Sequence, residues 1–166
     1  MRPGGRGSVL LLLLAALVLL RPWEELDLGE EPAGSASVLV TRVVDGDTVE
    51  VQLDGAEEDV RYIGVDTPET VKPGAPVDCF GPQASSFNHR LVEGRRVRLV
   101  FGEERRDQYG RLLAYVYFGD RFVNAELVRL GLARTLFIPP NDRFEGQLKR
   151  LEIAAARAGR GLWGAC

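Results

Sequence analysis

Three acidic residues in two short turn-like stretches could bind a metal ion. Asp47 lies in VVDGDTVEV, and Asp66 and Glu69 lie about twenty positions later in VDTPET. Asp, Gly, Thr and Pro are also the residues that turns require, so these acids could simply form turns. Carboxylate oxygens are nevertheless the hard ligands that Ca²⁺ and Mg²⁺ prefer. The twelve-residue ligand spacing of an EF-hand is missing, so folding would have to assemble such a site from separate strand ends.

Two arginines could bind a phosphate group beside these acids. Arg61 precedes VDTPET, and Arg111 ends the stretch DQYGR. Each could equally be a solvated surface charge. Arg61 and Asp66 would point to opposite faces of a regular strand, so only a bend or bulge would let both reach one ligand. In that case a metal ion would neutralise one phosphodiester oxygen while the guanidinium groups bind the others.

Other catalytic chemistries lack the residues that they need. The single histidine, His89, is expected on the exposed side of a helix and without a function. The sequence contains no Cys/His cluster for zinc and no glycine-rich phosphate loop, and a serine triad would depend on that one histidine. The formal net charge of −3 provides no global basic field for nucleic acid, although a local positive potential can still attract it.

Apolar runs and turn signals predict the elements that must position these residues. Strands are expected over residues 38–44, 49–53, 60–65, 97–101 and 112–117, and a hairpin is expected at Asp45-Gly46. Helices are expected over residues 82–93, from a cap at Asn124 to Gly131, and from near Asn141 to Gly159. Strands that precede inserted helices are typical of an α+β fold. The sequence therefore predicts a five-stranded OB-type β-barrel with three helices.

The N-terminal residues have the layout of an export signal. Arg2 and Arg6 precede an apolar run from Val9 to Leu20, which is shorter than the ~20 residues of a comfortable transmembrane helix. A small-x-small cleavage site is missing directly after Leu20, so cleavage and retention as a short membrane anchor both stay open. We expect a signal peptide or signal anchor over residues 1–20, a linker over 21–37 and one domain over 38–166. The protein would be exported, either secreted or periplasmic.

Two cysteines, Cys79 and Cys166, could form a disulfide in an exported chain. In the cytosol they would instead be two free thiols. The bond requires the segment after the last helix to pack near the start of the first helix. Neither cysteine adjoins a predicted catalytic residue, so we expect reduction to lower thermal stability more than activity.

Several motifs resemble those of the staphylococcal nuclease (thermonuclease) family. They are DGDTVEV, IGVDTPET, FGPQAS, DQYGRLLAYVY and VNAELVRLGLA, and the resemblance covers about residues 38–163. It implies an OB barrel with three helices. It also implies a Ca²⁺-dependent phosphodiesterase that acts on DNA and RNA. We expect a monomer without a stable protein partner.

The resemblance assigns the acids to a calcium site and a general base. Asp47 and Asp66 match the family's carboxylate calcium ligands. Thr67 matches the residue that contributes its backbone carbonyl. Glu69 matches the acid that activates the attacking water.

The resemblance assigns the basic and aromatic residues to the substrate. Arg61 and Arg111 match the arginines that bind the phosphate and stabilise its transition state, and Tyr109 matches a tyrosine of the nucleotide pocket. The departures concern this pocket, where three residues replace a family lysine and two family tyrosines, namely Gln108, Phe137 and Pro139. Phe137 could stack on a base or belong to the core.

Two other functions are compatible with the same barrel. A non-catalytic nucleic-acid-binding OB module would bind single strands without cutting them. Loss of a metal-binding acid or a phosphate-binding arginine would indicate such a module, and none is lost. A calcium-stabilised structural domain would leave Arg61 and Arg111 without a role.

Overall fold

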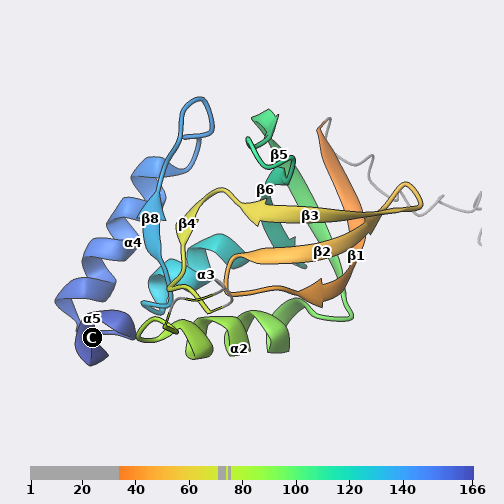
Figure 1. Ribbon diagram of the computed structural model, residues 1–166. Helices are drawn as coiled ribbons and strands as arrows, with labels where there is room; N and C mark the ends of the chain where they lie inside the picture. The colour runs from red at the N-terminus through yellow and green to blue at the C-terminus, as the bar shows by residue number, and fades with distance from the viewer. Residues whose placement is uncertain (1–33, 71–73, 75) are drawn as a thin grey trace, which may run out of the picture. The chain divides into compact units, whose positions relative to one another are not determined.

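The computed structural model describes residues 34–70, 74 and 76–166 of the 166-residue chain. They form an α+β fold in which helices pack around a closed β-barrel (Figure 1). The predicted leader over residues 1–20 and the predicted linker up to residue 33 lie outside the described residues. Within residues 34–70, 74 and 76–166, no helix is long and apolar enough to cross a membrane.

The barrel is formed by β1 (Ser35–Val43), β2 (Thr48–Leu53), β3 (Ala56–Tyr62), β5 (Arg96–Arg106) and β6 (Leu112–Phe118). Neighbouring strands pair antiparallel in the order β3-β2-β1-β5-β6, and a parallel pairing of β3 with β6 closes the sheet. The short β7 (Arg121–Phe122) adds to β6 through a hairpin. The predicted OB-type barrel with three helices is therefore confirmed.

Apolar residues on alternate strand positions fill the barrel. Val40, Val49, Val51, Val60 and Leu99 come from four different strands, and each is fully buried. Because side chains along a strand alternate between its two faces, one face of every strand lines the interior. Burial of this face supplies the main driving force for barrel formation.

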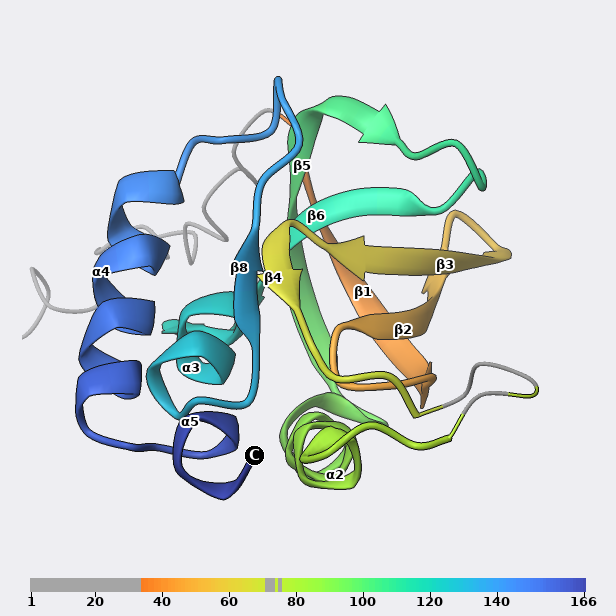
Figure 2. The same cartoon turned by 60° about the vertical axis from the view of Figure 1, so that its left-hand side comes forward.

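The helix α2 (Gly81–Val92) packs against the barrel beside β1 (Figure 2). Ala84 and Leu91 enter the core. Asn88 is also fully buried, because its Oδ1 accepts a hydrogen bond from the hydroxyl of Tyr62 at 3.1 Å and its Nδ2 donates one to the carbonyl of Asp45 at 3.2 Å. His89 is exposed, as expected.

The remaining elements are β4 (Gly64–Asp66), α3 (Val123–Arg129), β8 (Arg134–Leu136), α4 (Glu145–Arg157) and the single turn α5 (Leu162–Ala165). The antiparallel β4–β8 pair lies between the barrel and α4 in Figures 1 and 2. The helix α3 packs against both α4 and β6.

Two asparagines that were predicted to mark helix starts bind distant backbone instead. Asn124 lies within α3, where its Nδ2 donates to the carbonyl of Ile63 at 2.8 Å and its Oδ1 accepts from the N–H of Val116 at 2.9 Å. Asn141 lies before α4 and bonds both backbone groups of Glu104, at 2.9 and 3.1 Å. The predicted cap at Asn124 was wrong, and α4 begins at Glu145, four residues after Asn141. Both amides instead satisfy backbone groups that the fold buries or brings together.

Strand boundaries differ from the prediction at β1 and β5. The strand β1 begins at Ser35, so the last residues of the predicted linker pair with β5 over Arg98–Val100. The strand β5 continues to Arg106 through a stretch that was expected to be a charged loop, with a register shift after Phe101. The charged side chains are accommodated because this end of the strand is largely exposed.

Candidate active site

A bend after β3 brings Arg61 and Asp66 to the same side of the chain. The predicted strand over residues 60–65 is interrupted between Tyr62 and Gly64, and Gly64 has a φ of +79°. Glycine adopts this left-handed conformation readily. A Cβ at this position would also lie 2.8 Å from the ring of Phe137. Across the bend, Arg61 Nη2 donates to Asp66 Oδ1 at 2.9 Å. The bend that would let both residues reach one ligand is therefore present.

The turn between β1 and β2 brings Asp47 to the same place. The N–H of Asp47 donates to Asp45 Oδ1 at 3.0 Å, which shapes the turn. Gly46 packs against Thr67, because a Cβ on Gly46 would lie 2.6 Å from Thr67 Cγ2. The N–H and the hydroxyl of Thr67 both donate to Asp47 Oδ2, at 2.6 and 3.1 Å. The DGD turn and the VDTPET turn therefore form one structural unit.

The carboxylate of Asp47 is held in a buried and acidic environment. Asp47 is only 4% exposed. Burial, supported by the nearby charges of Asp45 and Asp66, raises the pKa of Asp47 to about 7, although the guanidinium of Arg61 and the amide of Thr67 act in the opposite direction. A further positive charge beside Asp47 would therefore stabilise its ionised form.

The carboxylate oxygens of Asp47 and Asp66 are ligands of the kind that a hard divalent cation prefers. Arg61 Nη1 lies 3.2 Å from Asp47 Oδ2, and Arg61 Nη2 lies 2.9 Å from Asp66 Oδ1, so one cationic group already contacts both acids. Oxygen ligands of this kind suit Ca²⁺. Among the residues that the structure describes, no group of three or more His, Cys, Asp or Glu side chains is arranged to bind a metal. An ion would therefore need backbone oxygens or water in addition to the two carboxylates.

A cavity of about 420 Å³ adjoins this cluster. Both arginines line it, together with Tyr109 and Gln108 from the β5–β6 loop. Arg111 Nε donates to Asp107 Oδ2 at 2.7 Å, and Arg111 Cζ lies 5.4 Å from the centre of the Tyr109 ring. Tyr109 is 75% exposed, so its ring is open to a ligand.

The far wall of the cavity contains apolar residues that the sequence did not single out. Leu136 and Ile138 flank Phe137 in the chain and are 46% and 66% exposed, which is high for large apolar side chains. Phe137 itself packs against the hydrophobic core. Of the two roles left open for Phe137, the structure favours the core. Neither Phe137 nor Pro139 is among the residues that line the cavity.

The sequence predicted a turn at Asp45 but gave this acid no role in the site, and it did not single out Asp107. Asp107 Oδ1 accepts hydrogen bonds from the backbone N–H groups of Tyr109 and Arg111 at 2.9 and 3.0 Å, and so shapes the DQYGR loop. Asp107 could have been recognised as a turn former in the same way as Asp45, because each accepts a hydrogen bond from a backbone N–H two residues later.

Glu69 lies in the loop that follows β4 and is not among the residues that line the cavity. Its N–H donates to Asp78 Oδ2 at 3.1 Å, and its carbonyl accepts from the N–H of Asp78 at 2.9 Å. Its Oε1 accepts from the N–H of Thr70 at 2.8 Å. The backbone of Glu69 is thus bound to the residue that precedes Cys79.

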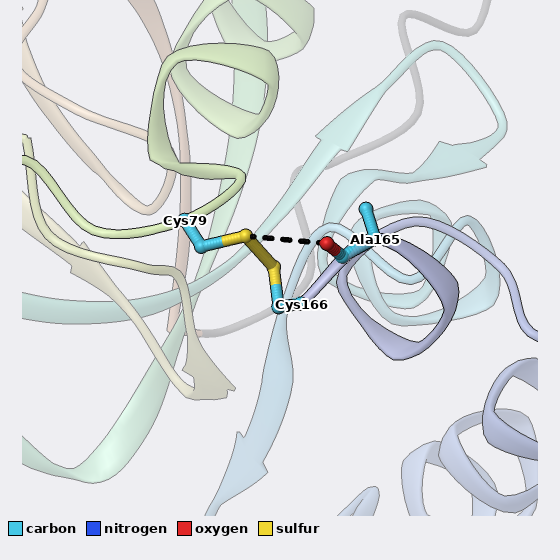
Figure 3. The surroundings of a disulfide bond; sticks show 3 residues. All are labelled: Cys79, Ala165 and Cys166. Atoms are coloured by element: carbon cyan, nitrogen blue, oxygen red, sulfur yellow. Dashed lines mark hydrogen bonds between the residues drawn. A yellow bond between two sulfur atoms is a disulfide. The ribbon is translucent and has the colours of Figure 1, made fainter.

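Cys79 and Cys166 form a disulfide, which confirms the predicted pairing (Figure 3). The carbonyl oxygen of Ala165 lies 3.8 Å from the Cys79 sulfur. Because a bonded sulfur has no proton, the dashed line between them in Figure 3 marks a close contact without a donated hydrogen bond. Both cysteines line a groove of about 340 Å³ together with Asp66 and Thr67. The disulfide therefore lies beside two predicted metal ligands, although none of the predicted catalytic residues Arg61, Glu69 and Arg111 lines this groove.

The fold and this cluster define a class of protein, an OB barrel that presents carboxylates and arginines together at one face. The family model described as staphylococcal nuclease homologue matches residues 59–165, a range that begins after Asp47. The chain belongs to the staphylococcal nuclease family, as its motifs predicted.

Curated relatives support the same assignment. The chain is 46% identical over 127 residues to the thermonuclease of Staphylococcus intermedius, covering 76% of each protein. It is 40% identical over 135 residues to the thermonuclease of Staphylococcus hyicus, covering 81% of this chain and 80% of the relative. It is also 40% identical over 129 residues to endonuclease YncB of Bacillus subtilis (strain 168), covering 76% of this chain and 61% of the relative.

Proposed function

We propose that this protein is a Ca²⁺-dependent nuclease that hydrolyses phosphodiester bonds in DNA and RNA. One observation carries the proposal: Arg61 contacts both Asp47 and Asp66 and shares a cavity with Arg111. A phosphodiester is a ligand that needs cationic groups on several of its oxygens at once. The relatives named thermonuclease and endonuclease support the same reaction class.

In this proposal Asp47, Asp66 and the backbone carbonyl of Thr67 hold the ion. When bound, Ca²⁺ would polarise the phosphodiester and favour deprotonation of water near the phosphorus. Asp47 is held in place for this role by the N–H and hydroxyl of Thr67, so little reorganisation is needed. Ca²⁺ should support more activity than Mg²⁺, because Mg²⁺ requires a tighter octahedral arrangement.

The remaining residues act on the substrate. Arg61 and Arg111 bind the phosphate oxygens and stabilise the negative charge that develops on them. Asp107 restricts Arg111 to one orientation, which lowers the entropy lost when the phosphate binds. Glu69 accepts the proton of the attacking water. Tyr109, with the apolar wall opposite, binds the base or sugar.

The disulfide also supports an exported location. Disulfides persist in oxidising compartments and are rare in the cytosol. The basic and apolar N-terminal residues supply the corresponding signal in the sequence. We infer that the protein is exported and acts as a monomer.

The proposed function is tested with the purified full-length protein. Labelled single-stranded DNA and RNA are incubated with the protein in Ca²⁺, and again after excess EGTA. We expect both substrates to be cleaved in Ca²⁺ and neither in EGTA. Undiminished cleavage in EGTA would contradict the metal requirement, whereas binding without cleavage would identify a non-catalytic module.

A further inference from the structure

We propose that Asp78 and the Cys79–Cys166 disulfide position the carboxylate of Glu69, so that closing this disulfide raises the turnover number. The inference rests on the proposed function, because it takes Glu69 as the base. It goes further by assigning positioning roles to residues outside the catalytic cluster. It also predicts that turnover responds to thiol redox state.

The first step is the reciprocal pairing of Glu69 with Asp78. The Asp78 carboxylate accepts the N–H of Glu69 at 3.1 Å, while the N–H of Asp78 donates to the carbonyl of Glu69 at 2.9 Å. Both backbone polar groups of Glu69 are therefore bound by a single residue. This pairing sets the direction in which the Glu69 side chain leaves the backbone.

The second step is the close packing of the chain around residues 78–81. Gly81 lies against the backbone of the VDTPET turn, since an added Cβ would lie 3.0 Å from the carbonyl oxygen of Pro68 and 3.1 Å from that of Glu69. Phe80 has a φ of 70°, a left-handed conformation that a bulky residue keeps only when its surroundings hold it there. Cys79 is the covalent attachment point within this segment.

The third step is the anchor on the other side of the disulfide. Leu162 of α5 is 3% exposed, and its N–H donates to the carbonyl of Gly131 at 2.9 Å. Trp163 stacks under the guanidinium of Arg134 at 4.3 Å, and Arg134 pairs with Asp66 in the β4–β8 ladder. The turn that precedes Cys166 is therefore packed against β8, the strand that pairs with the strand carrying Asp66.

These contacts make the disulfide a covalent link between the segment that binds the backbone of Glu69 and the C-terminal turn that packs near Asp66. The bond connects the residue after Asp78 to a packed anchor, and Asp78 binds the backbone of Glu69. Reduction by a dithiol such as dithiothreitol transfers two electrons and two protons to the bridge. Two cysteine thiols form, and the dithiol becomes its cyclic disulfide. Asp78 then loses its covalent restraint, and Glu69 is less often in its productive position.

The first experiment compares Asp78→Ala and Asp78→Asn with Asp120→Ala, an exposed aspartate in the β6–β7 turn that serves as a control. The turnover number and KM on single-stranded DNA, the melting temperature, and Ca²⁺ affinity by calorimetry are measured on the full chain. We expect Asp78→Ala to lower the turnover number about 10-fold, with KM and Ca²⁺ affinity changed less than about 2-fold. Asp78→Asn should recover most of the turnover, because its amide oxygen still accepts the N–H of Glu69.

The second experiment repeats these changes in a Glu69→Gln background. If Asp78 and the disulfide act through Glu69, then Asp78→Ala, Cys79→Ser/Cys166→Ser and dithiothreitol should each cause no further loss there. In the wild type, dithiothreitol should lower the turnover number about 10-fold at a temperature well below melting. Oxidised glutathione should restore it after the dithiothreitol is removed.

The outcomes separate this inference from the proposed function. Absence of cleavage by the wild type, or full activity of Glu69→Gln, would overturn the proposed function. A damaging Glu69→Gln combined with full activity of the reduced protein and of Asp78→Ala would overturn only the positioning role. Equal losses in the wild-type and Glu69→Gln backgrounds would show a merely structural effect and would also overturn it. If Asp78→Ala does not fold, the reduced wild type and Cys79→Ser/Cys166→Ser supply the same comparison in the wild-type and Glu69→Gln backgrounds.

Discussion

Replacing Asp107 with asparagine should separate the shape of the β5–β6 loop from the orientation of Arg111. Asp107 Oδ1 accepts the backbone N–H groups of Tyr109 and Arg111, whereas Oδ2 accepts from Arg111 Nε at 2.7 Å. An asparagine oxygen can still accept the two backbone hydrogen bonds. Its amide nitrogen can only donate, so it would face the guanidinium donor to donor and release Arg111.

The expected loss is larger in activity than in stability. The Arg111–Asp107 ion pair is partly exposed, with 30% and 17% of the two side chains accessible, so it contributes about 0–1 kcal/mol to folding. Asp107→Ala would additionally remove the acceptor of two backbone N–H groups, each worth about 1 kcal/mol. An arginine that stabilises developing charge contributes on the order of 10²–10³-fold in rate. Because a released arginine still reaches the phosphate part of the time, we expect Asp107→Asn to lower the turnover number about 10-fold.

The assay measures the turnover number, KM and melting temperature for Asp107→Asn, Asp107→Ala and Arg111→Ala. Glu58→Gln is the matched control, because it breaks another carboxylate–arginine pair, with Arg106 at 2.8 Å, outside the cavity. The control should keep the wild-type turnover number. Full activity of Asp107→Asn would refute the reasoning. So would a 10-fold loss that persists when Arg111 is already alanine.

Further predictions concern the base, the metal and the disulfide. Glu69→Gln should lower the rate on the order of 10²-fold or more, whereas His89→Ala should leave it unchanged, because His89 is exposed and pairs with Glu93, at 2.7 Å, away from the site. Steady-state kinetics with both variants decides this, and equal damage would contradict the assigned roles. Asp47→Asn should abolish Ca²⁺ binding in calorimetry, because it removes a buried charged ligand; unchanged affinity would place the ion elsewhere. Cys79→Ser/Cys166→Ser should lower the free energy of unfolding by about 4 kcal/mol, the upper end expected for a sequence separation of 87 residues; denaturant titration measures this, and an unchanged midpoint would contradict the chain-entropy reasoning.

The barrel strands and α2 could be predicted from the sequence because their signals are local. β-Branched residues alternate with polar ones, which predicts strands with one buried face, and Pro82 and Gly94 mark the ends of α2. The helix cap predicted at Asn124 was wrong, and α4 begins at Glu145, four residues after Asn141. An asparagine amide can cap a nearby helix or bond backbone groups that are distant in the sequence. A local sequence pattern indicates only the first of these.

The sequence by itself determined which chemical groups are available: hard oxygen ligands, arginines and two cysteines, within motifs that identify the family. The tertiary structure decided which of these groups meet. The bend at Gly64 aligns Arg61 with Asp66, and the β1–β2 turn brings Asp47 against Thr67. Packing of α5 against the β4–β8 pair places the disulfide beside Asp66 and Thr67. Residue type and spacing report turn preference and periodicity, whereas proximity between distant groups depends on how the whole core packs, which no short stretch of sequence encodes.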